Sequence, residues 1–343
     1  FKESFDSVED YLKCFSILSS VLQSGPNIER FAYEFAQDNY EEGVRYFEVR
    51  LAPQLHAQLG DEGLSICDVL RSLNAGLKKA ADEYNSKIQS EDEPEYKYAI
   101  IVSALRMFTE AHSAYYKALI HCHQYEDPRR VYGLASMALA VAAVEVRDKN
   151  GVPVVAIDVA GAERGFPASD HVDAFNYAHE NFLNTTCHAG EGYGPSSIFQ
   201  AVMYLHADRI GHGFHIFSSN LLKSTIPDRN KYIQGLVQYL SQRRIALEVC
   251  VTSNLGTMPG LRLEDHPVHR MIQEQLSVTL CTDNRLVSNT TTVKELALVA
   301  NTFKLTARQL RDVVIAGFKR SFYPGSYADK RRYSGSSTPV ICA

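Results

Sequence analysis

The chain has 343 residues, of which 45% are hydrophobic and 22% are charged, a composition typical of one large globular domain or two small ones. Its formal net charge of −5 lacks the basic excess of proteins that bind a phosphate backbone, so we expect no nucleic-acid partner. The longest nearly apolar stretch, residues 134–146, is interrupted by Ser136 and Glu145. It is shorter than the roughly 20 residues that a membrane-spanning helix needs, so we expect no membrane partner.

Cysteine usage and the N-terminus bear on the cellular compartment. The seven cysteines, an odd number without a CxxC pair, do not indicate a disulfide framework. Cys187, Cys250 and Cys281 lie inside apolar runs, so we expect them to be buried free thiols. The N-terminal residues FKES contain no apolar signal core. These features predict a cytoplasmic protein, unless processing has removed a signal.

Helical patterns begin near the N-terminus and recur between short apolar runs. Apolar residues follow helical spacing from Ile28 to Ala36, and Gly43 can end that helix. Two later helices are expected to start with capping boxes, formed by Thr292 with Glu295 and by Thr306 with Gln309. The runs rich in apolar and β-branched residues predict strands at residues 45–53, 98–106, 154–161, 185–191, 209–213, 246–254 and 277–284.

The alternation of strands and helices favours an α/β fold with a parallel sheet, because the strands are apolar on both faces. The two standard forms are an open doubly wound sheet and a closed barrel. The GxG at residues 211–213 lacks the third glycine of a dinucleotide-binding turn. Nearly every predicted strand ends in polar or glycine residues, as at the catalytic mouth of a barrel. An open sheet would gather such residues at one switch point. We therefore predict a (β/α)8 TIM barrel in which the first strand is missing.

No repeat or linker divides the chain, so we expect a single barrel domain over residues 1–343. The polar stretch at residues 84–95 reads as a loop insertion, and residues 148–151 read as a turn before a strand. The last residues, about 334–343, are expected to form a flexible tail.

Four side chains at predicted strand ends suggest a metal-dependent site. His188 can bind zinc through a neutral ring nitrogen, and Asp283 can supply an oxygen ligand. Glu191, three residues after His188, can reach a substrate beside the metal, and His212 stands between two glycines that leave room around it. Zinc lowers the pKa of bound water from about 15.7 towards 7, which suits metal-assisted hydrolysis.

Each of these residues also has a structural interpretation. A lone histidine such as His188 is more often a packing residue, and a strand-end aspartate such as Asp283 often caps a helix. Glu191 alone fits a surface loop, and His212 alone fits close packing beside glycine. The prediction therefore depends on all four residues meeting at one barrel mouth.

A separate HxH pair, His121 and His123, lies in a stretch that looks helical. Two histidines at this spacing share a face on a strand but not on a helix. We therefore expect no metal at this pair.

Six segments in chain order carry a family resemblance. They are EVRLAP at 48–53, VVAIDVAG at 154–161, HAGE at 188–191, RIGHG at 209–213, LEVCVTSN at 247–254 and TDN at 282–284. Together they resemble the ordered motifs of the adenosine deaminase family, and the similarity extends from about residue 31 to about residue 323.

The resemblance implies a role for each strand-end residue. His188 looks like a zinc ligand, and Glu191 looks like the acid that protonates purine N1. His212 resembles the group that orients and stabilises the attacking hydroxide. Asp283 looks like both a zinc ligand and a partner of the attacking water.

Two further positions resemble contacts to the purine ring. Gly161 looks like the backbone donor to N3, and Asn284 occupies the position that contacts N7. Many family members carry a second aspartate at that position. An amide can donate a hydrogen bond to N7 directly, whereas a carboxyl group must first be protonated.

The implied reaction is zinc-dependent deamination of adenosine or 2′-deoxyadenosine to the inosine product and ammonia, as in purine salvage, by a monomer or homodimer. One alternative is a deaminase of adenine or of an N6-substituted AMP. A cytidine-deaminase type is disfavoured because its H-x-E and PCxxC elements are absent. A non-catalytic purine-binding protein is the alternative if the chain is complete.

The family's first strand carries an HxH pair that gives two further zinc ligands, and the chain begins after that point. The missing strand and the missing ligands are thus one gap, and three protein ligands are the minimum for a zinc site. We expect that the native protein has an additional N-terminal segment. A native mass equal to 38.4 kDa would contradict this expectation.

Overall fold

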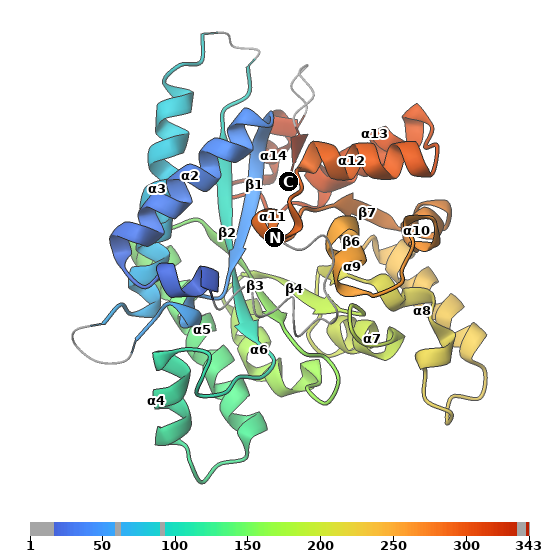
Figure 1. Ribbon diagram of the computed structural model, residues 1–343, viewed down its shortest axis with the longest axis horizontal. Coiled ribbons are helices and arrows are strands. Elements are labelled where there is room, and N and C mark those ends of the chain that lie inside the picture. The colour runs from blue at the N-terminus through green and yellow to red at the C-terminus, as the bar shows by residue number, and fades with distance from the viewer. Residues whose placement is uncertain (1–16, 59–62, 90–92, 335–340, 343) are drawn as a thin grey trace.

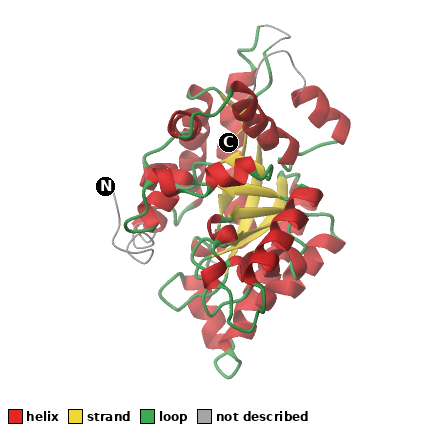
Figure 2. Ribbon diagram, turned by 90° about the vertical axis from the view of Figure 1, so that its right-hand side faces the viewer, coloured by secondary structure: helices red, strands yellow, loops and turns green. Residues whose placement is uncertain are grey.

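The computed structural model describes residues 17–58, 63–89, 93–334 and 341–342. Its strands form one sheet in the order β7-β6-β5-β4-β3-β2-β1-β8, and every described pairing is parallel. In Figure 2 the strands gather at the centre of the molecule with helices around them. The strands are β1 (Val44–Leu51), β2 (Lys97–Leu105), β3 (Val154–Ala160), β4 (Asn184–Ala189), β5 (Arg209–His212), β6 (Ala246–Val249), β7 (Ser277–Leu280) and β8 (Ile341–Cys342).

All seven predicted strands are present as β1 to β7, and they lie side by side in chain order. The largest differences are in β6 and β7, which end five and four residues before the predicted ends because the chain leaves the sheet after Val249 and after Leu280. The amide of Cys281 still donates to the carbonyl of Val249, and a helix begins at Val251. Thr252, Ser253 and Asn254 of LEVCVTSN therefore lie on a helix that follows the strand.

Consecutive parallel strands separated by helices confirm the α/β-barrel class, with seven strands curling in barrel order. The two-residue strand β8 pairs with the other side of β1. Ser334 ends a helix, and the rest of the expected tail up to β8 lies outside the described residues. Within the described residues, no helix has the length and apolar character needed to cross a membrane.

The helices cover the strands, and α2 packs against α3 beside β1 and β2 (Figure 1). The helices are α2 (Gly25–Glu41), α3 (Ile66–Asn85), α4 (Ala114–Cys122), α5 (Pro128–Asn150), α6 (Val172–Glu180), α7 (Pro195–Met203), α8 (Arg229–Arg243), α9 (Val251–Thr257), α10 (Val268–Gln273), α11 (Arg285–Ser288), α12 (Thr292–Thr302), α13 (Ala307–Arg320) and α14 (Tyr327–Ser334).

The predicted helix signals are mostly confirmed. The helix α2 is followed by Gly43 at φ +88°, and α13 begins with the capping box of Thr306 and Gln309. The box predicted for α12 is wrong by one residue, because Thr291 is its N-cap. Glu295 is instead fully buried and accepts hydrogen bonds from the amide of Thr252 and the hydroxyl of Thr290.

The polar stretch predicted as a loop at residues 84–95 begins inside α3, which ends at Asn85, and residues 90–92 lie outside the described part of the chain. Cys187 and Cys250 are buried free thiols as expected. The expectation was wrong for Cys281, which is only half-buried, because it follows the end of β7 rather than lying inside the sheet.

Buried His171 makes stability depend on pH. The side chain of His171 is fully buried, and its Nδ1 lies 2.7 Å from the hydroxyl of Ser136. Burial and the nearby charge of Arg106 lower the pKa of His171 to about 3. The unfolded chain, with an ordinary histidine pKa, binds a proton more readily below about pH 6.5, so acid favours unfolding.

We expect the free energy of unfolding to fall by about 1.4 kcal/mol more in the native protein than in His171→Gln between about pH 7.5 and about pH 5.5. Urea unfolding at the two pH values measures the difference. His121→Gln, which removes an exposed histidine, should keep the native pH slope. Equal slopes for the native protein and His171→Gln would contradict the assignment.

Candidate active site

The predicted site residues lie at the carboxyl ends of neighbouring strands. His188 is in the last part of β4, His212 ends β5, and Asp283 follows β7 by three residues. Gly161 directly follows β3, and Glu191 stands in the loop after β4. The fold therefore brings these residues to one end of the barrel.

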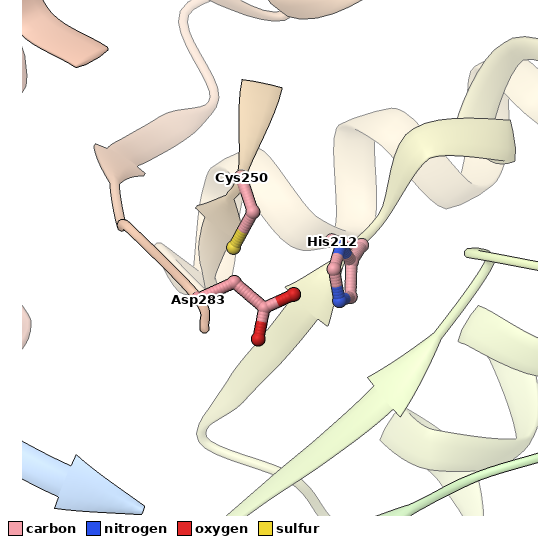
Figure 3. A group of neighbouring side chains, drawn as sticks. All are labelled: His212, Cys250 and Asp283. Carbon is pink, nitrogen blue, oxygen red and sulfur yellow. The ribbon is translucent and has the colours of Figure 1, made fainter. Parts of the chain in front are cut away.

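Three ligand-type side chains form a close group at this end. One ligand atom from each of His212, Cys250 and Asp283 lies within 4.8 Å of the others. Figure 3 shows the carboxylate of Asp283 between the thiol of Cys250 and the imidazole of His212. The ring of His188 lies 5.3 Å from that of His212, measured between centroids, but is not a member of this group. Cys250 is thus an additional ligand-type residue that the sequence did not single out as one.

Two of these residues have strained backbone conformations that set the direction of their side chains. His212 and Asp283 adopt left-handed conformations at φ +61° and +53°, which are uncommon for residues other than glycine. Such conformations each cost on the order of 1–3 kcal/mol and often occur at functional sites. The hydroxyl of Ser253 donates to Asp283 Oδ2 at 2.7 Å, and Nδ2 of Asn284 donates to Oδ1 at 2.8 Å. These bonds hold the carboxylate in one orientation.

A buried carboxylate orients His188. Nδ1 of His188 lies 3.1 Å from Oδ1 and 3.0 Å from Oδ2 of Asp158, which is fully buried and also accepts from Ser103 at 2.7 Å. Burial disfavours the charged imidazole, but Asp158 outweighs it and raises the pKa of His188. With Nδ1 donating to a carboxylate, the other ring nitrogen, Nε2, is the one available to a metal.

Below His188, a chain of alternating charges fills the barrel interior. Nη2 of Arg50 bonds Glu248 at 2.7 Å, and Arg209 contacts both Glu248 at 2.6 Å and Glu48 at 2.7 Å. Burial alone would raise the pKa of Glu248, but the two arginines lower it to about 2. Arg50 also lies 3.7 Å from Asp158, which links this chain of charges to His188.

A chain of hydrogen bonds through His266 and Asn254 fixes the position of the hydrogen on the His212 ring. The amide of Val268 donates to Nδ1 of His266, so the other ring nitrogen of His266 carries a hydrogen and donates to Oδ1 of Asn254 at 3.2 Å. Nδ2 of Asn254 then donates to Nδ1 of His212 at 3.2 Å. His212 therefore carries its hydrogen on Nε2, which faces Glu191 at 3.6 Å. Burial lowers the pKa of His266 to about 4, which keeps His266 itself neutral.

Glycine is required where the backbone approaches His188. A Cβ on Gly211 would lie 3.2 Å from Cα of His188 and 3.3 Å from its ring carbon Cγ. A side chain at this position would therefore press on the imidazole, which explains the first glycine of the RIGHG motif.

The loop that carries Glu191 is held by a single buried carboxylate. Glu163 accepts hydrogen bonds from the backbone amides of Gly190, Glu191 and Gly192, each at 2.8 Å. Among the described residues, Glu163 is not a member of the group formed by His212, Cys250 and Asp283. It is a positioning residue that fixes the loop between His188 and Glu191.

Replacing Glu163 by Gln is expected to lower the free energy of unfolding by about 1–3 kcal/mol, because one of its acceptor oxygens becomes a donor that faces a backbone N–H. The amides of residues 190–192 should exchange with deuterium faster. Urea unfolding and hydrogen exchange measure the two effects, with the exposed Glu264→Gln as a control. Unchanged exchange in Glu163→Gln would show that the carboxylate does not hold the loop.

Asp158, Ser253 and Asn254 lie towards the ends of predicted strands, but the sequence gives them no role. It does not single out Glu163 or His266 either. The contacts that bring these residues into the site join positions 12 to 42 residues apart along the chain, so no local motif reveals them. The polar ending of each strand was the one signal available for three of them.

The HxH pair lies where the sequence suggested, near the end of a helix. His121 is in the last turn of α4, and His123 is the residue that follows the helix. His121 is exposed and lies 3.3 Å from Glu110. Neither histidine belongs to the group of possible metal ligands found among the described residues.

An imidazole backed by a carboxylate, a second imidazole with a defined donor, and two further carboxylates thus converge at the mouth of an α/β barrel. This arrangement is typical of a metal-dependent hydrolase. A model of the adenosine deaminase family matches residues 1–332. The adenosine deaminase of Mycobacteroides abscessus is 33% identical over 321 residues, which cover 93% of this chain and 77% of that protein.

The chain belongs to the adenosine deaminase family, whose members are metal-dependent. It is therefore an aminohydrolase, an enzyme that removes an amino group by hydrolysis.

Solved structures share the fold at lower identity. The N6-mAMP deaminase of Arabidopsis has a TM-score of 0.72 and 22% identity, and the match covers 96% of this chain and 83% of that one. An amidohydrolase from Burkholderia ambifaria with bound zinc has a TM-score of 0.69 and 20% identity, covering 92% and 72%.

Proposed function

We propose that the protein catalyses zinc-dependent hydrolytic deamination of adenosine and 2′-deoxyadenosine, giving the inosine products and ammonia for purine salvage. The observation that carries the proposal is the convergence of His188, Glu191, His212 and Asp283 at one barrel mouth in a chain of this family. The cytoplasmic location, the single domain and the monomeric or dimeric state remain predictions.

The types of donor atom at the site fit zinc. Imidazole nitrogen and carboxylate oxygen are both common zinc ligands, and we assign His188 Nε2 and Asp283 as the ligands that this chain supplies. The Nδ1 contact to Asp158 supports the assignment, because metal-bound histidines usually donate their other ring N–H to a carboxylate or carbonyl. When bound, zinc polarises a water molecule so that it becomes a nucleophile near neutral pH.

The protein residues would then carry the proton transfers and the orientation of the purine. Glu191 would donate a proton to N1 as the water oxygen adds to C6, and Asp283 would accept the proton that the water loses. That proton would pass to the amino nitrogen, the C6–N bond would break with release of ammonia, and the remaining hydroxyl proton would return to Glu191 as the C6 carbonyl forms. His212 directs its Nε2–H towards the side of the site where Glu191 lies, and it stabilises charge on the attacking oxygen. The backbone N–H of Gly161 and the amide of Asn284 are assigned to N3 and N7 of the purine.

A different 6-aminopurine is the second candidate substrate. The similar fold of an N6-mAMP deaminase favours this possibility at the level of fold. Adenine is a further member of the same class of substrate. The reaction at C6 and the roles of Glu191 and His212 would be the same, since these substrates differ at the sugar, the phosphate or the N6 substituent.

A panel of 6-aminopurines tests the proposal. Metal-replete protein should reduce the ultraviolet absorbance of adenosine and 2′-deoxyadenosine and release ammonia, with a higher kcat/KM than for adenine or N6-methyl-AMP. A higher kcat/KM for one of the latter compounds would transfer the assignment to that substrate. Binding of nucleoside without turnover and without zinc would favour a non-catalytic purine-binding protein.

A further inference from the structure

A second site lies at the opposite end of the barrel. A hollow of about 380 Å³ opens beside the first residues of β4 and β5, Asn184 and Arg209, and beside Ile245, which precedes β6. The strands are parallel, so their carboxyl ends carry His188 and His212 while these amino ends face the other way. The hollow is therefore separate from the candidate active site.

Cationic side chains dominate the lining of this hollow. Arg243, Arg244, Lys319 and Arg320 all line it. Among the ion pairs found within the described residues, none involves these four side chains. By contrast, Arg308 and Arg311, on the same helix as Arg320, both lie near Asp312.

Acidic side chains contribute little charge to the lining of the hollow. Asp208 is the one acidic residue among the described residues that line the hollow. Its carboxylate already accepts hydrogen bonds from the amide of Thr185 at 2.9 Å and the hydroxyl of Thr185 at 3.4 Å. The hollow thus gathers a positive charge that the protein does not neutralise, although the whole chain carries a net charge of −5.

The cations also lie close enough to repel one another. The pKa of Arg320 is lowered by its burial and by the charge of Arg244. Arg243 and Arg320 end α8 and α13, where a cation interacts favourably with the helix dipole. That effect accounts for a cation at each helix end, but it does not explain two further cations around the same hollow.

We propose that this hollow is a binding site for an oligophosphate anion. A single phosphate group carries about −1.5 to −2 charges near neutral pH, which is less than the four cations of the hollow can neutralise, although one of them, Arg243, also lies 4.5 Å from the ring centre of Tyr239. Arginine is suited to the task, because its guanidinium group can donate two parallel hydrogen bonds to phosphate oxygens. The proposal is independent of the deaminase reaction, since it concerns residues at the other end of the barrel.

The test compares a double variant in the hollow with a matched one elsewhere on α13. Arg244→Asn with Arg320→Gln removes two charges, and asparagine tolerates the left-handed backbone at residue 244, φ +55°. Arg308→Gln with Arg311→Gln removes the same charge from exposed positions. Thermal unfolding shows whether both double variants remain folded.

Titration calorimetry with inorganic triphosphate and with ATP measures binding at low ionic strength. We expect the hollow variant to bind triphosphate at least about tenfold more weakly than the native protein, and the α13 control to bind it equally well. Equal affinity for ATP would show that the phosphate chain is sufficient, and tighter binding of ATP would show that the nucleoside also contacts the hollow. Either result supports the site, provided that the hollow variant binds the compound more weakly than the native protein does.

The proposal is overturned if native protein binds neither compound, or if the hollow variant retains native affinity. The latter result would place the ligand elsewhere, for example at the catalytic mouth. Equal weakening in both double variants would indicate general charge attraction rather than a site.

Discussion

Replacement of Glu191 by Gln is expected to lower kcat for adenosine by about 10³-fold, because the amide cannot give a proton to purine N1. The change keeps the size of the side chain and does not touch the bonds from Glu163, which reach the backbone of the loop rather than the side chain of Glu191. Metal content and the free energy of unfolding should therefore stay close to native values.

The matched control is Glu180→Gln, at the exposed end of α6. It makes the same chemical change away from the mouth, so its kcat should be native. Full activity of Glu191→Gln in protein with native metal content would remove Glu191 from the mechanism.

Replacement of Asp283 by Ala is expected to lower kcat by a comparable factor, because the variant lacks a metal ligand and binds zinc more weakly. Losing an outer partner of a metal ligand usually costs about 10–100-fold in affinity, so losing a ligand itself should cost more than about 100-fold. Asp158→Asn provides the intermediate case, since it changes the partner of His188 rather than a ligand. We expect zinc affinity to decrease from native protein to Asp158→Asn to Asp283→Ala.

Metal analysis after dialysis against a buffered zinc concentration measures this series. Asp265→Ala, which removes an exposed carboxylate paired with Arg262, is the control and should retain native zinc. Native zinc affinity in Asp283→Ala would show that Asp283 is not a ligand, even if the variant were inactive for another reason.

Most of the strands could be predicted from the sequence because they are largely buried on both faces. The run from Val154 to Ala160, for example, is apolar at nearly every position, and only burial in a parallel sheet accounts for that pattern. Boundaries were less certain where residues of one type adjoin. Thr290, Thr291 and Thr292 can each cap a helix, and only the three-dimensional structure shows that Thr291 does so.

Residues of the candidate site could be predicted where a short stretch of sequence marks their position in the fold. The polar end of a buried strand identified His188, and the flanking glycines identified His212. The partners that orient these imidazoles could not be found this way. Asp158 meets His188 across the sheet, and His266 reaches His212 only through Asn254. Such contacts form only when the strands and the loops that follow them pack together in the folded chain.

Cys250 is a further residue whose neighbours at the site could not be predicted from the sequence. The sequence indicated a buried thiol, and the structure confirms the burial. The apolar run around Cys250 gave no sign that its sulfur would lie within 4.8 Å of ligand atoms of His212 and Asp283. In this arrangement both ring nitrogens of His212 are engaged, because Nδ1 accepts from Asn254 and Nε2 carries the hydrogen, so the ligand set around Asp283 is the one that includes His188.

Anomalous X-ray diffraction at the zinc edge, from crystals of metal-replete protein, tests the central claim most directly. The account predicts a zinc ion at about 2.0–2.2 Å from both Nε2 of His188 and a carboxylate oxygen of Asp283. An ion bound by His212, Cys250 and Asp283 without His188, or no ion at this mouth in metal-replete crystals, would contradict it.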